Sequence, residues 1–186
     1  MKIDAIWRPE VQQQIYRRLL DAYARPGTLE IVKELCGGHR AWIGLLSTLL
    51  DGQTSFADPH SLLDQDDWSL LQARRDVPEN AMFVLCDGTR RPDFEPSLGT
   101  LESPEKGATL IIPVERLGEG EEMDLSGPGI LGTRTLAVTG LDDAWIESRS
   151  NWVAAFPLGV DWVLADGDQF VALPRTTRIN MALKVE

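Results

Sequence analysis

The sequence predicts a single α/β domain over residues 1–186, with a mixed β-sheet covered by helices. Segments whose apolar residues recur at helical spacing alternate with short apolar runs typical of strands, which is the pattern of an α/β fold. No linker, internal repeat or low-complexity stretch divides the chain. Near the carboxy terminus Asp166-Gly167-Asp168 separates two apolar runs as in a β-hairpin, so the sheet should not be wholly parallel.

The first fifty residues should form two helices and a strand. A helix should begin at Pro9, because proline suits the first helical turn and apolar residues then recur every three or four positions. Pro26-Gly27 should end it, since proline cannot continue a helix and glycine accepts a positive φ. A strand is expected at Thr28–Leu35. The next helix, at about Arg40–Leu50, is apolar on nearly all sides and should therefore lie deep in the core.

The middle of the chain should alternate a helix with two strands. Asp58-Pro59 has the residue types of a helix N-cap and first turn, and the acidic run Asp64–Asp67 is a point where that helix could divide. Short strands are expected at Ala81–Cys86 and Ala108–Val114, and the second is apolar on both faces, which suits a central position. Residues 90–105 contain three prolines and should be irregular.

The last seventy residues should be mostly strands around one helix. The acidic, glycine-rich run Gly118–Glu122 predicts a surface turn, followed by one or two strands between Met123 and Val138. A helix should follow the caps Asp142 and Asp143, with apolar residues at helical spacing from Trp145 to Phe156. Further strands are expected at Val160–Ala165, Gln169–Leu173 and Arg178–Leu183.

The composition excludes several classes of partner. The chain has 18 basic and 29 acidic side chains and a net charge of −11, whereas nucleic acids and anionic membrane surfaces attract basic patches. No apolar run reaches the 18 residues of a membrane span, and the amino terminus lacks the apolar core of a signal peptide. We therefore expect a cytoplasmic protein without nucleic-acid or membrane partners. Cys36 and Cys86 are isolated in apolar surroundings and should be buried thiols.

Common catalytic and cofactor motifs are weak or absent. Gly127–Gly132 matches the GxGxxG pattern, but the β-branched residues after it indicate a loop and a strand, not the helix that a dinucleotide site needs. There is no GxSxG elbow, and His39 and His60 should be surface or capping residues. The acidic run at 64–67 lacks the ligand spacing of a calcium loop. We therefore expect no metal and no catalytic residues.

A pyridoxal phosphate enzyme also lacks support. Such an enzyme needs a lysine in an apolar pocket to form the Schiff base. Lys2 and Lys184 lie near the chain ends, while Lys33 and Lys106 adjoin glutamates. We therefore expect no cofactor.

Arg175, Thr176 and Thr177 are the most suggestive polar group. A guanidinium with two adjacent hydroxyls, directly after an apolar strand, can bind a phosphate or phosphonate oxygen. The alternative is an arginine that ties down its own loop or pairs with a carboxylate, which the acidic excess favours. Both interpretations remain open at this point.

Five segments, in order along the chain, resemble the PhnH family, the H subunit of the bacterial carbon–phosphorus lyase system for phosphonate breakdown. They are Tyr16–Ala22 with Pro26-Gly27, Leu49–Asp51 with Thr54, Gly107–Ile111, Leu125–Ile130, and Phe156–Asp161 with Ala172–Thr177. Tyr16 and Tyr23 stand where that family usually has phenylalanine and methionine, and Ala73–Asp76 lacks an expected histidine. A role for that histidine is therefore not carried over.

The resemblance implies a three-layer sandwich similar to the core of pyridoxal phosphate-dependent transferases, without that cofactor. It implies a homodimer that assembles with the G, I and J subunits. In this system the G, H and I subunits, with the L protein, transfer the ribose triphosphate of ATP onto a phosphonate with release of adenine, and the J subunit then cleaves the carbon–phosphorus bond. The implied role is a non-catalytic assembly subunit of a ribose 1-methylphosphonate 5-triphosphate synthase-type transferase, with no activity alone. The alternative is a phosphonate- or nucleotide-binding subunit that uses Arg175, Thr176 and Thr177.

An assembly subunit should carry apolar contact surfaces, and six tryptophans could supply them. Trp7 and Trp68 are the candidates for such a surface. The alternative, that all six tryptophans fill the core, stays open.

Overall fold

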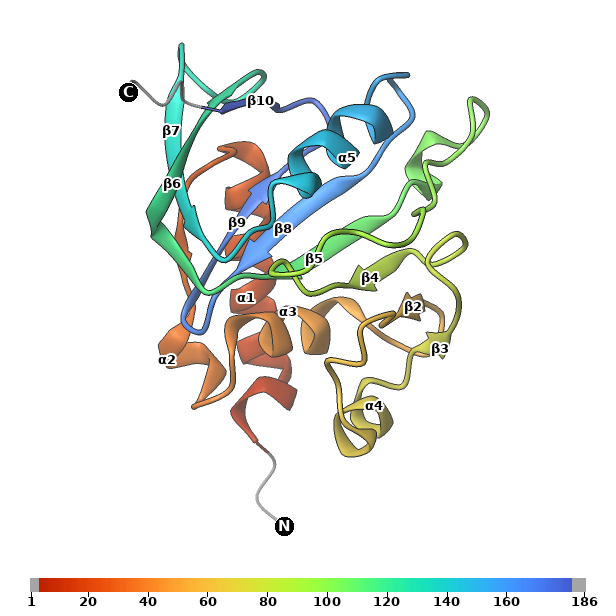
Figure 1. Cartoon of the computed structure of the whole chain (residues 1–186). Helices are drawn as coiled ribbons and strands as arrows, with labels where there is room; N and C mark the ends of the chain where they lie inside the picture. Colours follow the sequence, from red (N-terminus) through yellow and green to blue (C-terminus); the bar gives the residue numbers. More distant parts are fainter. Residues whose placement is uncertain (1–3, 182–186) are drawn as a thin grey trace.

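Seven strands form the main sheet in the computed structural model of this protein, which describes residues 4–181. Their spatial order is β1-β9-β8-β5-β4-β2-β3 (Figure 1). Five of them run parallel, β9 is antiparallel to β8, and β1 is antiparallel to β9. The sheet is therefore mixed, as predicted. The strands are β1 Glu30–Ile31, β2 Ser55–Ala57, β3 Arg74–Arg75, β4 Phe83–Leu85, β5 Thr109–Pro113, β8 Asp161–Ala165 and β9 Gln169–Leu173.

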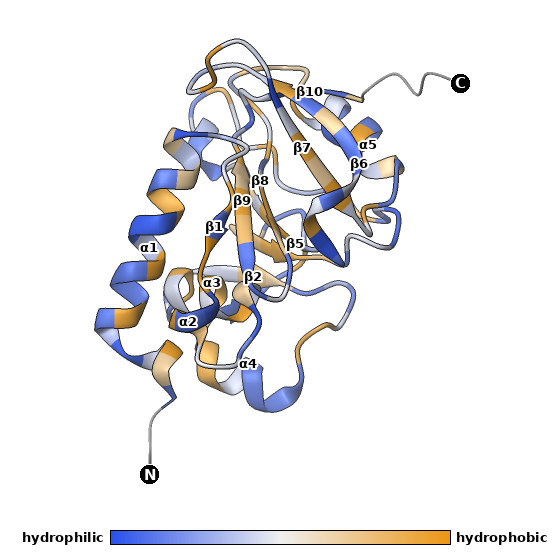
Figure 2. Ribbon diagram, turned by 90° about the vertical axis from the view of Figure 1, so that its left-hand side faces the viewer, coloured by the Kyte–Doolittle hydropathy of each residue, from blue (hydrophilic) through white to orange (hydrophobic). Residues whose placement is uncertain are grey.

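Helices cover both faces of this sheet. The described residues form α1 Pro9–Ala24, α2 Lys33–Cys36, α3 Ala41–Leu49, α4 Gln65–Leu71 and α5 Ala144–Trp152, with 3-10 turns η1 Ala5–Trp7 and η2 Pro104–Lys106. Helices α1 and α3 pack on one face, and α5 packs on the other (Figures 1 and 2). The predicted helices starting at Pro9 and at about residue 40 are confirmed. None of the helices within residues 4–181 is long and apolar enough to cross a lipid bilayer.

A second, three-stranded antiparallel sheet lies on the same side of the main sheet as α5 (Figure 2). Its strands are β6 Arg116–Ser126, β7 Arg134–Thr139 and β10 Arg178–Met181, in the order β10-β6-β7. The sequence predicted strands here but not that they form a separate sheet. The last two residues of the predicted strand Arg178–Leu183 lie outside the described residues.

The surface turn predicted at Gly118–Glu122 is wrong, because this run belongs to β6. The register of β6 with β7 shifts between Leu117 and Glu121, which both pair with Val138, so the acidic, glycine-rich residues between them interrupt the regular pairing. Gly118 and Gly120 have φ of +86° and +105°, values that glycine adopts without steric cost. Glycine and acidic residues thus form an irregular stretch inside a long strand here.

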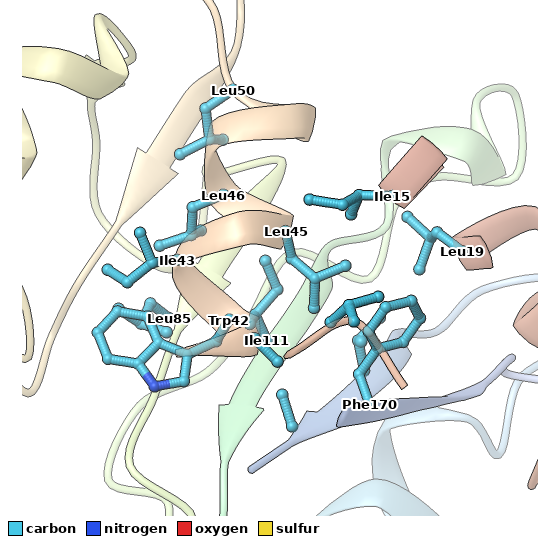
Figure 3. Packing of buried hydrophobic residues seen from close by; sticks show 14 of the residues in the cluster. Ile15, Leu19, Trp42, Ile43, Leu45, Leu46, Leu50, Leu85, Ile111 and Phe170 are labelled. Carbon is cyan, nitrogen blue, oxygen red and sulfur yellow. The ribbon is translucent and has the colours of Figure 1, made fainter. Parts of the chain in front are cut away.

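Strict alternation of side chains divides the core into two halves. In β5, Ile111 packs toward α1 and α3, while Leu110 and Ile112 pack toward α5 and the second sheet. Figure 3 shows Ile111 and Phe170 of the sheet meeting Leu45 of α3 beneath α1. A central strand buried on both faces has a continuous apolar run, which is why the sequence predicted β5 correctly.

Residues 58–71 depart from their prediction. The helix begins only at Gln65, because the Asp64 carboxylate accepts hydrogen bonds from the backbone N–H groups of Asp66 and Asp67 and so caps α4. The Asp58 carboxylate instead accepts from the N–H groups of Leu62 and Leu63, which holds a turn outside any helix.

Two other segments are shorter than predicted. The strand expected at Thr28–Leu35 is the two-residue β1, after which α2 begins at Lys33. The helix expected to reach Phe156 ends at Trp152, and the Phe156 side chain is 67% exposed. Of the two predicted caps, the Asp142 carboxylate accepts from the N–H of Ala144 at 2.9 Å, whereas Asp143, at the N-cap position, makes no side-chain cap hydrogen bond.

The second sheet is fastened to the carboxy-terminal end of α1. Nη1 of Arg134 donates to the carbonyl of Pro26 at 2.8 Å and to Oγ1 of Thr28 at 2.6 Å. Gly129, with φ of +82°, approaches the carbonyl of Ala24 so closely that a Cβ there would lie 2.5 Å from its oxygen. These contacts fix the position of the glycine turn between β6 and β7, which the sequence correctly predicted as a loop followed by a strand.

Candidate functional site

A groove of about 1090 Å³ lies between α5 and the segment that leads from β9 into β10. Figure 1 shows these two elements side by side near the carboxy terminus. Arg175, Thr176 and Thr177 all contribute to its wall, together with Arg149 from α5. The structure therefore brings the three predicted site residues to the same concave surface.

Arg175 is held by acceptors within the protein. Its Nη2 donates to Oδ2 of Asp161 at 2.7 Å, and its Nε lies 3.3 Å from the same oxygen. Its Nη1 donates to the carbonyls of Pro104 at 2.9 Å and Pro157 at 3.1 Å. The two charged side chains are only 14% and 19% exposed, so this ion pair is partly desolvated. Arg175 thereby joins three separate loops.

The approach of these loops leaves no room for a side chain at Gly107. A Cβ at this position would collide with the carbonyl oxygen of Gly159 and lie 3.0 Å from both Nη atoms of Arg175. The Gly107–Ile111 segment singled out in the sequence therefore begins with a glycine for a steric reason.

The two threonines differ in exposure. Thr176 is exposed, whereas Thr177 is only 1% exposed. The backbone N–H of Thr177 donates to the carbonyl of Pro174 at 2.8 Å, but its Oγ1 has no hydrogen-bond partner among the described residues. A buried hydroxyl without a partner is uncommon and costs free energy.

Arg149 was not predicted as a site residue, and it is the most unusual side chain of the groove. It is 3% exposed, and its Nη2 donates to the carbonyls of Leu173 at 3.2 Å and Pro174 at 2.6 Å. Its Nε has no partner among the described residues. Burial lowers the pKa of the guanidinium to about 10, although the negative charge of Asp161 opposes this. Arg149 therefore remains protonated near neutral pH.

A sequence signal for Arg149 existed. Trp145 and Trp152 flank it at spacings of four and three residues, so all three side chains lie on the same helical face. Both tryptophans are buried, and the Cζ atom of Arg149 lies 5.2 Å from the ring centroid of Trp162. An arginine on the apolar face of a predicted helix indicates a buried charge.

The remaining wall of the groove is partly acidic and partly apolar. Asp143 and Glu147 are exposed on α5. Phe156 and Met181 are exposed apolar side chains on the same groove, at 67% and 40% of their surfaces. An apolar surface beside a few polar groups is typical of ligand sites.

His60, expected to be a surface or capping residue, does not lie at the surface, because its side chain is 1% exposed. Nδ1 accepts a hydrogen bond from the N–H of Asp87 at 2.8 Å, so Nε2 carries the proton and donates to Asp93 at 3.0 Å. This hydrogen bond lowers the pKa of the Asp93 carboxyl. His60 is thus buried where two loops cross. His39 is half-buried, 3.4 Å from Asp4.

Other reactive side chains do not converge on the groove. Cys36 and Cys86 are free and buried, as predicted, and burial raises the pKa of the Cys36 thiol to about 11. Within residues 4–181 no group of three acidic, histidine or cysteine side chains is placed to hold a metal ion. Lys33 and Lys106 are exposed, while Lys2 and Lys184 lie outside the described residues.

Trp7 and Trp68, the candidates for a contact surface, are half-buried against the core on the α1 and α3 side. The Trp68 ring packs 4.9 Å from that of Phe56 and lies 4.1 Å below the guanidinium carbon of Arg75. The other four tryptophans are buried. The most exposed of the large apolar side chains are instead Leu131 at 100%, Leu101 at 77%, Phe156 at 67% and Ile31 at 66%.

Comparison with known proteins finds one matching family and two similar proteins. Residues 5–180 match the family described as bacterial phosphonate metabolism protein (PhnH). The chain is 43% identical over 176 residues to the "Putative C-P lyase subunit protein HtxG" of Stutzerimonas stutzeri, covering 95% of this chain and 89% of that protein. It is 30% identical over 195 residues to the "Alpha-D-ribose 1-methylphosphonate 5-triphosphate synthase subunit PhnH" of Rhizobium meliloti (strain 1021), covering 90% of each.

Proposed function

Because this chain belongs to the PhnH family of bacterial phosphonate metabolism proteins, we propose that it is a non-catalytic assembly subunit of a carbon–phosphorus lyase complex. The observation that carries this proposal is similarity along nearly the whole chain to two proteins whose names describe them as subunits. The G, I and J subunits are the proposed partners, together with a second copy of this chain.

The proposed reaction is the transfer of the ribose triphosphate of ATP onto a phosphonate. The phosphonate oxygen attacks the anomeric carbon, its bond to that carbon forms, and adenine leaves as the carbon–nitrogen bond breaks. This chain would support the transfer without supplying reacting groups. Since ATP is the donor, we also propose a cytoplasmic location.

The surface of the chain supports a role in assembly. Large apolar side chains such as Leu131, Leu101 and Phe156 are mostly exposed, and contacts with other subunits would remove their apolar surface from water. The net charge of −11 favours the solubility of the free subunit before it forms such contacts.

Sedimentation velocity tests this proposal. The chain mixed with the G and I subunits at micromolar concentration should move as one faster boundary, and separate boundaries would contradict the assembly role. The chain alone, incubated with ATP and methylphosphonate, should release no adenine, whereas the mixture with the G, I and L proteins should release it. Adenine release by this chain alone would overturn the non-catalytic assignment.

A second candidate function is phosphonate or nucleotide binding through Arg175, Thr176 and Thr177. The observation that favours it is that all three line one groove. Arg175→Ala should then weaken the binding of methylphosphonate or ATP when binding is measured per folded molecule. Unchanged affinity in that variant would show that Arg175 serves only to hold its loops.

A further inference from the structure

Arg149 introduces a buried positive charge that forms no ion pair with a carboxylate among residues 4–181. Its only hydrogen-bond acceptors among these residues are two backbone carbonyls. Burying an unpaired charge is costly, so buried charges in proteins are normally paired or bind a ligand. The chain also carries 29 acidic side chains that could have supplied a partner.

Two further buried polar atoms lie unpaired in the same region. Oγ1 of Thr177 and Nε1 of Trp162 lack partners, and so does Nε of Arg149 itself. These three are the buried side-chain nitrogen and oxygen atoms without a hydrogen bond in the described part of the chain. Arg149 and Thr177 line the groove, and Trp162 packs against the Arg149 guanidinium. The buried side-chain atoms that lack a hydrogen-bond partner among the described residues therefore all lie at or beside this groove.

The neighbouring Arg175 differs from Arg149, because its own charge is paired within the protein. Its charge is neutralised by Asp161 at 2.7 Å, and two carbonyls occupy its Nη1. The Asp161 carboxylate interacts with Arg175 in a second way, because it also accepts a hydrogen bond from the Arg175 backbone N–H at 2.7 Å. Of the two arginines, Arg149 is thus the one whose buried charge forms no ion pair.

We propose that Arg149 and Thr177 form an oxyanion-binding subsite at the inner wall of this groove, and that its ligand is a tetrahedral phosphonate or phosphate group. This proposal deepens the second candidate function and rests on it. A guanidinium and a hydroxyl both donate to phosphoryl-type oxygens, and an oxyanion would neutralise the buried charge.

The shape of the groove fits such a group as one end of a larger ligand. Known small-molecule sites have volumes of roughly 300–1,000 Å³, and this groove holds about 1090 Å³. Its apolar side chains, among them Ile146, Val153 and Ile179, leave room for an organic portion beyond the anionic group. The exposed Asp143 and Glu147 would repel a second anionic group placed near them.

Calorimetric titration of the folded chain tests the subsite, with inorganic phosphate, methylphosphonate and ATP as separate probes. At least one of these should bind, and Arg149→Met should reduce its affinity tenfold or more. Arg8→Met is the control, because Arg8 is exposed at the start of α1, on the face of the main sheet opposite α5, and does not line the groove, and it should change affinity less than twofold. The order of the three affinities distinguishes a free phosphonate from a nucleotide phosphate as the source of the group.

Thr177→Val provides the second variant, since it removes the hydroxyl while keeping the size of the side chain. This variant should fold and should bind the probe severalfold more weakly. If Arg149→Met does not fold, the affinity of Thr177→Val alone tests whether the subsite binds the probe. Unchanged affinity in both variants, or binding of none of the three probes to the unaltered chain, would overturn the subsite. A loss of affinity in Arg175→Ala alone would leave the second candidate function standing and remove this one. Assembly with the G and I subunits is measured separately and does not depend on these outcomes.

Discussion

The two faces of the main sheet bury different kinds of side chain. The face under α1 and α3 is filled by aliphatic and aromatic groups, as Figure 3 shows for Leu45, Ile111 and Phe170. Its buried polar side chains have partners, since the Glu30 carboxylate pairs with Arg18 of α1 at 3.2 Å and the Ser47 hydroxyl donates to the carbonyl of Gly44 at 2.9 Å. The face under α5 and the second sheet instead includes a buried arginine and three unpartnered polar atoms.

The first face therefore contributes mainly to stability, whereas the second face carries the groups that we assign to binding. Apolar burial stabilises the fold by about 25 cal/mol per Å² wherever it occurs, whereas unpaired buried polar atoms oppose folding. Side chains that cost stability persist in a fold when they serve another purpose, and strained or unsatisfied groups therefore cluster at functional sites. The comparison predicts that substitutions on the first face affect stability, and that the arginine on the second face affects binding.

The largest effect should come from the first face. Phe170→Ala removes a fully buried ring between α1, α3 and the sheet, and such a cavity costs about 3–5 kcal/mol of unfolding free energy. Urea denaturation followed by circular dichroism measures the loss. Phe156→Ala is the matched control, since that ring is 67% exposed, and it should change stability by less than about 0.5 kcal/mol. Equal losses in the two variants would contradict the assigned core.

A smaller loss should follow from breaking the ion pair between Arg175 and Asp161. Arg175→Met leaves Asp161 partly buried without its partner, and we expect a loss of about 2–4 kcal/mol because the pair is mostly desolvated. The double variant with Asp161→Asn should recover part of that stability, since no uncompensated charge then remains. A single variant as stable as the unaltered chain would show that the pair contributes nothing to holding the loops.

A still smaller loss should follow from crowding beside that pair. Gly107→Ala forces a Cβ against the carbonyl of Gly159 and the Arg175 guanidinium, and overpacking of this kind costs about 1–3 kcal/mol. Gly52→Ala is the control, because a Cβ there meets no atom within 4 Å. Thermal melts of the two variants measure the difference, and the prediction fails if Gly107→Ala melts at the same temperature as Gly52→Ala.

Much of the first face could be predicted from the sequence, because its signals are local. The apolar spacing after Pro9 defines α1, and continuous apolar runs define β5, β8 and β9. Strands β2 and β3 were missed because they contain only three and two residues, too few to show a period. The exposed acidic run of β6 lacks an apolar face over Gly118–Glu122, so its residue types favoured a turn.

The candidate site depends on tertiary packing and could be predicted only in part. Arg175, Thr176 and Thr177 are adjacent in sequence, so their chemistry was visible there. The pairing of Arg175 with Asp161 and its distance from α5 depend on loops that meet only in the fold. Arg149 lies on the same helical face as Trp145 and Trp152, and the spacing alone could have shown that its charge is buried.

The smallest effect on stability should be that of Arg149→Met, and it gives the sharpest test of the comparison. Methionine keeps the apolar packing against Trp162 and removes an unpaired buried charge, although the carbonyls of Leu173 and Pro174 lose a donor. Replacing buried charges by apolar side chains is often neutral or stabilising, so we expect a change within about 1 kcal/mol. Urea denaturation, compared directly with Arg175→Met, measures it. If Arg149→Met destabilised the fold as much as Arg175→Met, Arg149 would be a structural residue, and the second face would differ from the first only in composition.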